Sequence, residues 1–426
     1  MDHADLTARH RAVMPKWQAP YYDEPIAIDH GEGRYVWDAE GKRYLDFFGG
    51  ILTTISGHGI PEVVQAIQEQ AAKLLHSSTL YLIPNAIELA EQIASLSPIP
   101  DAKVFFTTSG TEAVEAALML ATGWRKSNQV LALRNSYHGR SFATVAVTGN
   151  RGWSATQLSP FHVAFVQNGY RYRSPFKDLP DDEFVAACAA DLRNVIETGT
   201  AGDVACLIAE PIQGVGGFTV PPDGFFAAMK AVCDEYGILF IADEVQTGWG
   251  RTGEHFWGIE AHGVVPDLMV FAKGIGNGLS LAGVIARPEL MDSLPANSIS
   301  TFGGNPLVTA GALANLRYIL DNDLQGNARE VGGQLIGRLQ GLAGGSVGDV
   351  RGKGLMIGVE LVEPGTMTPS AEAAGKVLEA CKDGGLLVGK GGLYGNVLRI
   401  SPALSLTPAE ADEGYAALES AIKGLG

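Results

Sequence analysis

The sequence predicts an α/β fold whose large domain holds a mixed sheet of mostly parallel strands. Short apolar runs recur through the middle of the chain without polar alternation, which is typical of strands buried on both faces. Helical patterns lie between several of these runs, as the crossover connections of parallel strands require. The chain has 426 residues, enough for two or three lobes.

The first expected element is a helix that begins at Pro61, a residue type suited to the first helical position. Apolar residues at helical spacing give it one buried face: Val64, Ile67, Ala71 and Leu74. Buried strands are expected next, at residues 103–107, 129–134, 204–209, 238–242 and 268–272. Helices are expected between several of them, for example at residues 111–125 and 224–236.

The last third of the chain has a different pattern. Helices are expected at residues 306–320 and 330–342, followed by short strands near residues 355–361, 386–388 and 397–400. A final helix should begin at Thr407, because Thr407 and Glu410 form a capping box with Pro408 in the first turn. We therefore expect a large domain at residues 60–310 and a small domain built from residues 1–59 and 311–426.

Composition narrows the class of protein. Lys and Arg number 31 and Asp and Glu 47, so the net charge is 31 − 47 = −16, which argues against a nucleic-acid partner. The four cysteines form no close pair, and neither a disulfide framework nor a metal site is expected. No leader-like apolar segment and no long apolar run occur, so we expect a cytoplasmic protein without a membrane partner.

A candidate anion site follows the expected strand at residues 103–107. Ser109, Gly110 and Thr111 open the next helix, where backbone N–H groups and the positive end of the helix dipole are free to bind an anion. Ser109 and Glu112 also match a capping box, so a helix start without a ligand is the alternative.

Two other strands each deliver a reactive side chain at their carboxyl ends. Asp243 and Glu244 follow residues 238–242, and Lys273 follows residues 268–272. A lysine in such a place can be a surface residue whose charged end reaches water. Beside a carboxylate and an anion site, the better account is a buried lysine of lowered pKa, suited to Schiff-base chemistry.

Motifs of other enzyme classes match the sequence only in part or not at all. Gly274, Gly276 and Gly278 lack the spacing of a dinucleotide fingerprint and follow the lysine instead of preceding a helix. Ser280 lies in a near match to the nucleophile elbow of hydrolases, yet no partner histidine is indicated. Zinc-peptidase and P-loop motifs are absent from the sequence.

Several motifs in order resemble those of the class III pyridoxal-phosphate aminotransferases. They are SGTE at 109–112, YHGR at 137–140, EPIQG at 210–214, ADEVQTGWGRTG at 242–253, AKGIGNG at 272–278, TFGGNP at 301–306 and LRISP at 398–402. The resemblance covers nearly the whole chain and is greatest to the alanine:glyoxylate aminotransferase type 2 branch. It implies fold type I of the pyridoxal-phosphate enzymes, with a small α+β domain.

The resemblance also implies roles around the cofactor. Lys273 would bind pyridoxal phosphate covalently and later carry the substrate proton, while Asp243 would keep the pyridine nitrogen protonated. Tyr137 and Val245 would enclose the ring, and Gln246 would reach its phenolic oxygen.

Further cofactor contacts follow from the same resemblance. Ser109, Gly110 and Thr111 would hold the phosphate, and Thr301 would reach the phosphate of a neighbouring subunit in a homodimer. His138 would lie beside the cofactor in a supporting role, as would Arg140.

For the substrate, the resemblance points to Arg399, whose guanidinium matches a carboxylate in two places. A structural ion pair is the alternative for this arginine. Glu210 would contact the cofactor and pair with Arg399 when no carboxylate is bound. Ile51 and Leu52 would line the substrate pocket.

The expected activity is ping-pong transfer of an amino group from an amino acid or other amine to a small α-keto acid, such as pyruvate, glyoxylate or 2-oxoglutarate. Decarboxylases, racemases and aminomutases share this scaffold and remain alternatives. A serine hydrolase that uses Ser280 is a remote one.

Overall fold

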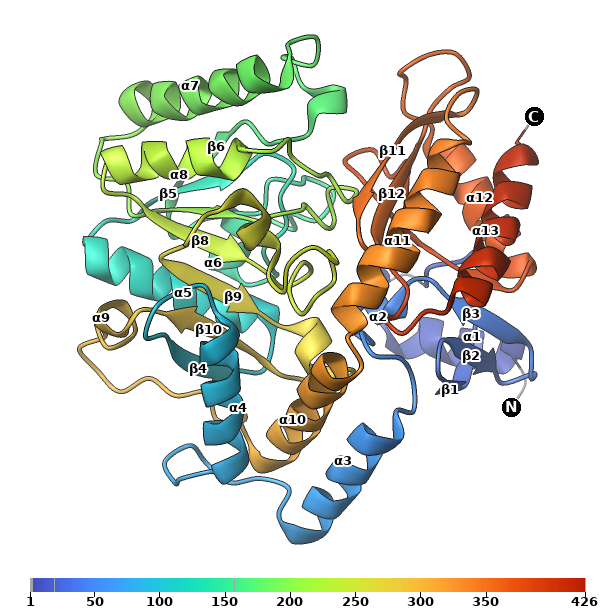
Figure 1. Ribbon diagram of the computed structural model, residues 1–426, viewed down its shortest axis with the longest axis horizontal. Helices are drawn as coiled ribbons and strands as arrows, with labels where there is room; N and C mark the ends of the chain where they lie inside the picture. The colour runs from blue at the N-terminus through green and yellow to red at the C-terminus, as the bar shows by residue number, and fades with distance from the viewer. Residues whose placement is uncertain (1–2, 19, 157, 426) are drawn as a thin grey trace.

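The computed structural model describes residues 3–18, 20–156 and 158–425. Its largest feature is a seven-stranded sheet in the order β4-β10-β9-β8-β7-β5-β6 (Figure 1). The strands are β4 (Lys103–Thr107), β5 (Gln129–Leu133), β6 (His162–Val166), β7 (Cys206–Ala209), β8 (Leu239–Asp243), β9 (Leu268–Phe271) and β10 (Ala282–Ala286). Only β10 runs antiparallel to its neighbours in this sheet, so the prediction of a mixed, mostly parallel sheet is confirmed.

All five predicted buried strands are present, with ends that differ from the prediction by one or two residues at most. Two strands of the sheet were not predicted. β6 is an edge strand whose sequence, HVAFV, begins with an exposed histidine, and β10 has the sequence AGVIA. Both are apolar runs of only four or five residues, whose periodicity alone does not distinguish a strand from part of a helix.

Helices cover both faces of this sheet. Along β5, Val130 and Ala132 belong to the buried cluster of α5 (Gly110–Arg125), whereas Leu131 and Leu133 belong to the cluster of α7 (Asp181–Gly199) and α8 (Phe225–Glu235). This alternation is the two-residue period of a strand, here apolar on both sides.

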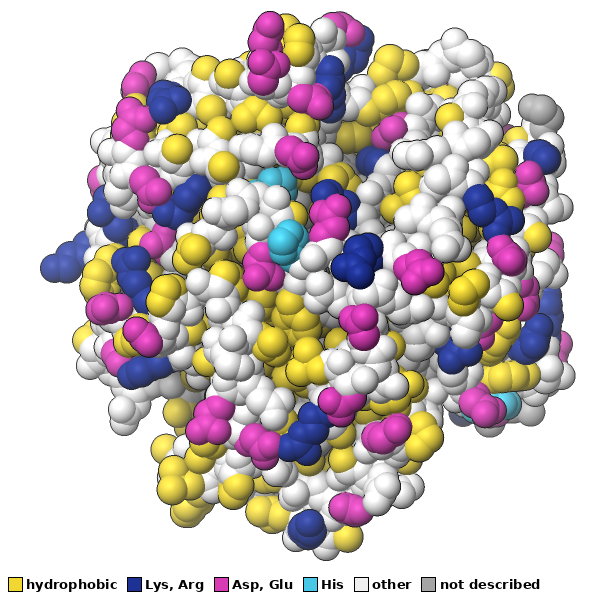
Figure 2. Space-filling model, in the orientation of Figure 1, with side chains coloured by type: hydrophobic (Ala, Val, Ile, Leu, Met, Phe, Trp, Pro, Cys, Tyr) yellow, Lys and Arg dark blue, Asp and Glu magenta, His cyan; other side chains and the backbone are white. Residues whose placement is uncertain are grey.

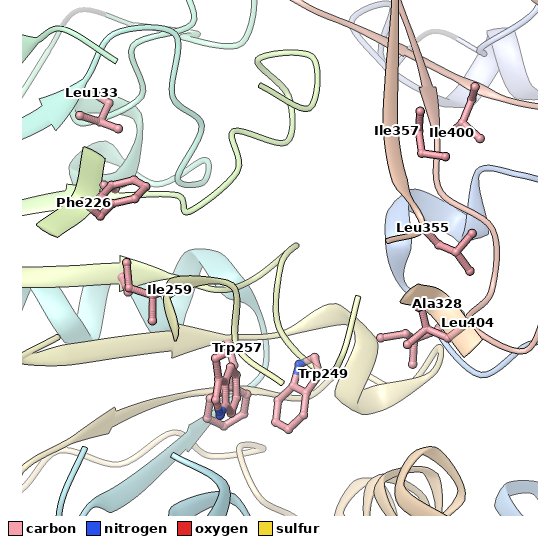
Figure 3. Close-up of a cluster of buried hydrophobic side chains, with 14 of the residues drawn as sticks. Leu133, Phe226, Trp249, Trp257, Ile259, Ala328, Leu355, Ile357, Ile400 and Leu404 are labelled. Carbon is pink, nitrogen blue, oxygen red and sulfur yellow. The ribbon is translucent and has the colours of Figure 1, made fainter. Parts of the chain in front are cut away.

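The buried cluster on the α8 side extends beyond the sheet. Trp249 and Trp257 lie side by side with ring centroids 4.6 Å apart. Figure 3 shows Ala328 and Leu404 beside Trp249, with Leu355 next to them, so apolar contacts continue from the large sheet into the second part of the molecule.

That second part holds two four-stranded sheets. One has the order β1-β2-β3-β13 and the other β11-β12-β15-β14. The strands are β1 (Ile28–Glu32), β2 (Tyr35–Asp38), β3 (Arg43–Asp46), β11 (Val347–Lys353), β12 (Met356–Leu361), β13 (Leu386–Leu387), β14 (Gly389–Gly391) and β15 (Val397–Ile400). The parallel pair of β3 and β13 joins segments from the first and last parts of the chain.

The helices of this part are α11 (Leu324–Gln340), α12 (Ala371–Asp383) and α13 (Pro408–Lys423). The capping box of Thr407 and Glu410 starts α13 as predicted. The prediction was wrong for α11, which begins six residues before residue 330. The Asp323 side chain caps it by accepting from the Gly326 N–H, and Gly326 lies in the first turn, where it weakens the helical pattern of the sequence.

The remaining elements complete the chain. They are α1 (His3–Val13), α2 (Gly49–Leu52), α3 (Pro61–Lys73), α4 (Pro84–Leu96), α6 (Phe142–Ala146), α9 (Pro288–Met291), α10 (Pro306–Asp321) and the 3-10 turns η1 (Arg171–Arg173), η2 (Gly258–His262) and η3 (Lys273–Gly276). Helix α10 packs against α3 and α4. The domain limits at residues 60 and 310 stay a prediction.

Surface features agree with the composition. Figure 2 shows acidic and basic side chains interspersed over one face, with no large basic area on it. Within the described residues, no helix has the length and apolarity needed to cross a membrane.

Candidate active site

The carboxyl ends of five strands meet at one edge of the large sheet and surround a cavity of about 160 Å³. Parallel strands present their carboxyl ends on the same side, which is where open α/β sheets bind ligands. The cavity is lined by Ser109, Gly110, Thr111, Tyr137, His138, Gly139, Glu210, Asp243, Val245, Gln246, Ala272 and Lys273. Apart from Gly139 and Ala272, these are all residues that the sequence predicted.

Asp243 is the last residue of β8 and is almost fully buried. Its Oδ2 lies 2.6 Å from Nδ1 of His138, and its Oδ1 accepts from the Val245 N–H at 3.1 Å. His138 is also buried, and its Nε2 has no hydrogen-bond partner among the described residues. His138 and the Val245 N–H therefore hold the Asp243 side chain in one orientation inside the cavity.

Lys273 follows β9, the strand next to β8, and has a φ of 50°, in the left-handed region. Burial lowers the pKa of Lys273 to about 8, while the negative charges of Asp243 and Glu210 oppose the fall and the positive charge of Arg399 adds to it. An amine of this pKa is partly neutral near pH 7.5 and can act as a nucleophile or a base.

Glu210 follows β7 and is fixed by backbone groups. Its Oε1 accepts from the Tyr137 N–H at 2.9 Å and its Oε2 from the Gly214 N–H at 2.7 Å. Burial raises the pKa of Glu210 to about 7, against the lowering effect of His138. Glu210 thus supports the loop that carries Tyr137.

Helix α5 begins at the cavity. The Ser109 side chain caps it by accepting from the Glu112 N–H at 3.2 Å, so the predicted helix start is present. A side chain at Gly110 would contact Val245 at 3.3 Å, so glycine leaves the helix start open towards the cavity. The first N–H groups of a helix have no acceptor within it and suit a phosphate.

Arg399 lies in β15, in the second part of the molecule, and is buried. Its Nη2 donates to Gln246 Oε1 at 2.9 Å, and its guanidinium lies 4.7 Å from the centroid of the Phe218 ring. Burial lowers the pKa of Arg399 to about 10. No ion pair joins Arg399 to Glu210 among the described residues, although the negative charge of Glu210 opposes the lowering of the Arg399 pKa.

Besides Arg399 and Arg140, three more predicted residues do not line the cavity. Thr301 is exposed, Ile51 is 43% exposed, and Leu52 is buried against Ile212 and Phe218. Ile51 and Leu52 have φ values of 67° and 62° and belong to the short left-handed turn α2. A branched side chain rarely takes this conformation, which costs of order 1–3 kcal/mol.

Sequence reasoning missed Tyr21. Its ring stacks on Phe48 at 5.4 Å, its hydroxyl donates to the Lys390 carbonyl at 3.0 Å, and it lies close enough to Arg399 to feel its charge. Burial raises the pKa of Tyr21, and Arg399 opposes the rise. No motif marks this tyrosine, because two of its partners, Lys390 and Arg399, lie at the other end of the chain.

Two other candidates have structural contacts instead. Glu244 points away from Asp243 and accepts from the N–H groups of Gly258 and Ile259 at 2.9 and 2.7 Å. Ser280 donates to the Thr108 carbonyl at 2.6 Å, and no histidine contacts it within the described part of the chain. The hydrolase alternative therefore has no triad.

The residues present fit pyridoxal phosphate. An amine, Lys273, and a carboxylate, Asp243, lie at the ends of neighbouring strands, and α5 begins at the same cavity with Gly110 and Thr111, whose N–H groups precede the one that Ser109 caps. These are groups that suit an aldehyde, a protonated ring nitrogen and a phosphate.

Comparisons with known proteins agree with this chemistry. The profile of the aminotransferase class-III family matches residues 17–422. An alanine–glyoxylate aminotransferase 2 homolog of Arabidopsis thaliana, named as mitochondrial, is 42% identical over 92% of this chain and 81% of its own. An alanine/serine racemase of Pyrococcus horikoshii is 36% identical over 94% of this chain and 86% of its own.

Among solved structures, an amine transaminase from an uncultivated Pseudomonas species, in its PLP-bound form, superposes with a TM-score of 0.90 at 34% identity. It covers 97% of this chain and 98% of that one. The chain belongs to the class III aminotransferases and is a transaminase that uses pyridoxal phosphate.

Proposed function

We propose that this transaminase moves an amino group from an amino acid or other amine to a small α-keto acid, such as pyruvate, glyoxylate or 2-oxoglutarate, through Lys273 and Asp243. The observation that carries the assignment is that these two side chains end adjacent strands and line one cavity with the start of α5. The cofactor supplies an electrophilic carbon and an electron-accepting ring.

Lys273 has two tasks in this proposal. Its amine would hold the cofactor covalently, and its Nζ would also hold and move the proton of the donor carbon. A pKa of about 8 suits both tasks near neutral pH, because the amine gains and loses a proton readily there. Asp243, fixed by His138 at 2.6 Å, would pair with the ring nitrogen of the cofactor.

The other cavity residues position the reactants. Tyr137 and Val245 enclose the ring, and Ser109, Gly110 and Thr111 bind the phosphate at the helix start. Arg399 binds the substrate carboxylate. Its Nε is buried without a hydrogen-bond partner among the described residues, which leaves a donor for that ligand.

The central experiment replaces the lysine. Lys273→Ala should lower the rate of amino transfer by about 10²–10⁴-fold or more, because both attachment and proton transfer are lost. Borohydride reduction of the wild type should bleach its visible band and label Lys273. The matched control is Lys16→Ala, an exposed lysine outside the cavity, which should retain the rate and the band. Labelling of another lysine would refute the assignment.

Racemisation is the second candidate, supported by the identity with the alanine/serine racemase. A panel of amino donors and keto acids, followed by absorbance in each half-reaction, separates the outcomes when released carbon dioxide and the chirality of the recovered donor are also measured. Loss of donor chirality without net transfer would favour racemisation over our proposal.

We also infer a homodimer in which Thr301 reaches the partner's cofactor. Apolar side chains gather near Thr301 and are exposed in the single chain: Leu80 at 75%, Leu82 at 89% and Phe302 at 59%. His76 and Phe302 lie 5.1 Å apart, which brings the segment of Leu80 next to that of Phe302. Such a surface is typical of a contact between subunits.

Sedimentation tests the dimer. Leu82→Asp should produce monomers with weakened phosphate affinity, whereas Leu158→Asp, a change at another exposed leucine, should leave dimers. Monomers that keep full cofactor affinity would contradict the role of Thr301. A cytoplasmic location is a further proposal, to be checked by fractionation, since the plant relative is named as mitochondrial.

A further inference from the structure

A second, larger cavity of about 470 Å³ lies between the central sheet and the sheet of β11, β12, β15 and β14. It shares no lining residue with the cavity of Lys273. Three arginines line it, Arg134 after β5, Arg151 after α6 and Arg173 in η1, and the aromatic rings of Tyr170 and Tyr394 form another part of its wall.

These arginines have free hydrogen-bond donors. Arg134 and Arg151 are exposed, and none of the described residues accepts a hydrogen bond from their guanidinium groups. Arg173 is partly buried, and its Nη2 is a buried donor without a partner in the described chain. A buried donor without an acceptor is unfavourable, and a bound acceptor would offset that cost.

The only acidic side chain in the wall, Glu360, is already engaged. Its Oε1 accepts from Arg173 Nε and from Asn396 Nδ2, and its Oε2 accepts from Arg351 Nη1 at 2.9 Å and from the Tyr170 hydroxyl. Both oxygens are therefore used, and Glu360 cannot neutralise Arg134 or Arg151.

The charges around the cavity sum to an excess of positive charge. Arg134, Arg151, Arg173 and Arg351 give +4, while Glu360 and Asp349, the ion-pair partners of Arg351, give −2, so the total is +2. The whole chain carries −16. A local positive charge in a concave wall attracts anions, and several guanidinium forks match carboxylate or phosphate oxygens.

We propose that this cavity is a second binding site for a small organic anion with two or more negative charges, of the polycarboxylate or phosphate class. Arg134, Arg151 and the free Nη2 of Arg173 bind its oxygens, and the ring of Tyr394 covers it. Because Arg134 follows β5 of the central sheet and Tyr394 lies between β14 and β15, the bound anion bridges the two parts of the molecule.

The test uses holoenzyme reduced with borohydride, in which the cofactor stays attached and occupies its own phosphate site. Inorganic phosphate and citrate are titrated separately by calorimetry at constant ionic strength, so that general screening does not change. We expect saturable binding of at least one probe at one site per chain, together with a higher melting temperature.

Variants identify the site. Arg134→Gln with Arg151→Gln should weaken binding about tenfold or more, because two charge-assisted contacts are lost. The control Arg125→Gln, at an exposed arginine that ends α5, should bind as the wild type does. Arg399→Ala should also bind normally, since Arg399 does not line this cavity.

Two results would overturn the proposal. One is no saturable binding of either probe in the wild type. The other is binding that survives the double arginine change and disappears with Arg399→Ala, which would assign the anion to the substrate carboxylate site. Circular dichroism and the melting temperature without ligand establish that the double variant is folded, so that its loss of binding reports on the cavity.

Discussion

Cofactor attachment to the apoenzyme should follow the pKa of Lys273. Only the neutral amine attacks the aldehyde of pyridoxal phosphate, so the rate depends on the neutral fraction. Burial lowers the pKa of Lys273 to about 8 from an ordinary 10.5, against the opposing charges of Asp243 and Glu210. The reaction should therefore reach half of its maximal rate near pH 8.

The size of the effect follows from the two pKa values. At pH 7.5 a group of pKa 8 is about 24% neutral, whereas an exposed lysine is about 0.1% neutral, a difference of roughly 240-fold. In free energy, the shift of about 2.5 pH units corresponds to roughly 3 kcal/mol. That is a large part of what distinguishes a reactive lysine from a surface one.

Stopped-flow absorbance measures attachment of the cofactor to apoenzyme between pH 6 and 10, a range of about two units on either side of the midpoint. Arg399→Gln should move the midpoint upwards, because a positive charge near the amine is removed, and Glu210→Gln should move it downwards. Ionisations of the cofactor itself are common to all three proteins and cancel in the comparison. A midpoint above pH 10, or identical midpoints in the three proteins, would refute the reasoning.

Two further predictions concern contacts in and beyond the site. Gly214→Ala would place a Cβ 2.2 Å from the Gln246 side chain and displace it from Arg399, so the Michaelis constant for keto acids should rise about tenfold or more in steady-state assays. Glu410→Gln should lower the free energy of unfolding by roughly 2 kcal/mol in urea titrations at pH 7, because Glu410 accepts from Arg34 at 2.7–3.0 Å. Burial alone would raise the pKa of Glu410, but the hydrogen bonds from Arg34 and Thr407 together outweigh burial and lower the pKa. This stability therefore exists above the unfolded pKa and is lost as the pH falls through the folded one.

Matched controls exist for both changes. Gly333→Ala adds a Cβ in open space and should leave the Michaelis constant unchanged. Glu372→Gln removes a fully exposed carboxylate and should have little effect on stability. If each control variant changed its measured quantity as much as the test variant did, the contacts of Gln246 with Arg399 and of Glu410 with Arg34 would not cause the effects.

It could be predicted from the sequence that Lys273 and Asp243 lie close together, because their proximity follows from the geometry of parallel sheets. Both residues follow apolar runs, and the carboxyl ends of neighbouring parallel strands lie together. Ser109 could be predicted for a similar local reason, since its capping pattern marks the start of a helix.

Contacts between distant segments could not be predicted in this way. Gln246 and Arg399 lie 153 residues apart, and nothing in either local sequence indicates that a glutamine will hold the arginine. The strand β10 was missed because its short run, AGVIA, has no clear strand signal of its own and forms a strand by pairing with β4 and β9. Tertiary packing, and not local preference, decides such elements.

The parallel pair of β3 and β13 has a consequence for synthesis of the chain. Leu45 pairs with Leu386, so the first hairpin leaves the ribosome long before its partner strand exists. At a translation rate of ~5–20 residues per second, this interval is on the order of tens of seconds. During that time an unpaired strand edge is open to aggregation, and a nascent chain of this protein should depend on chaperones until its last third has been made.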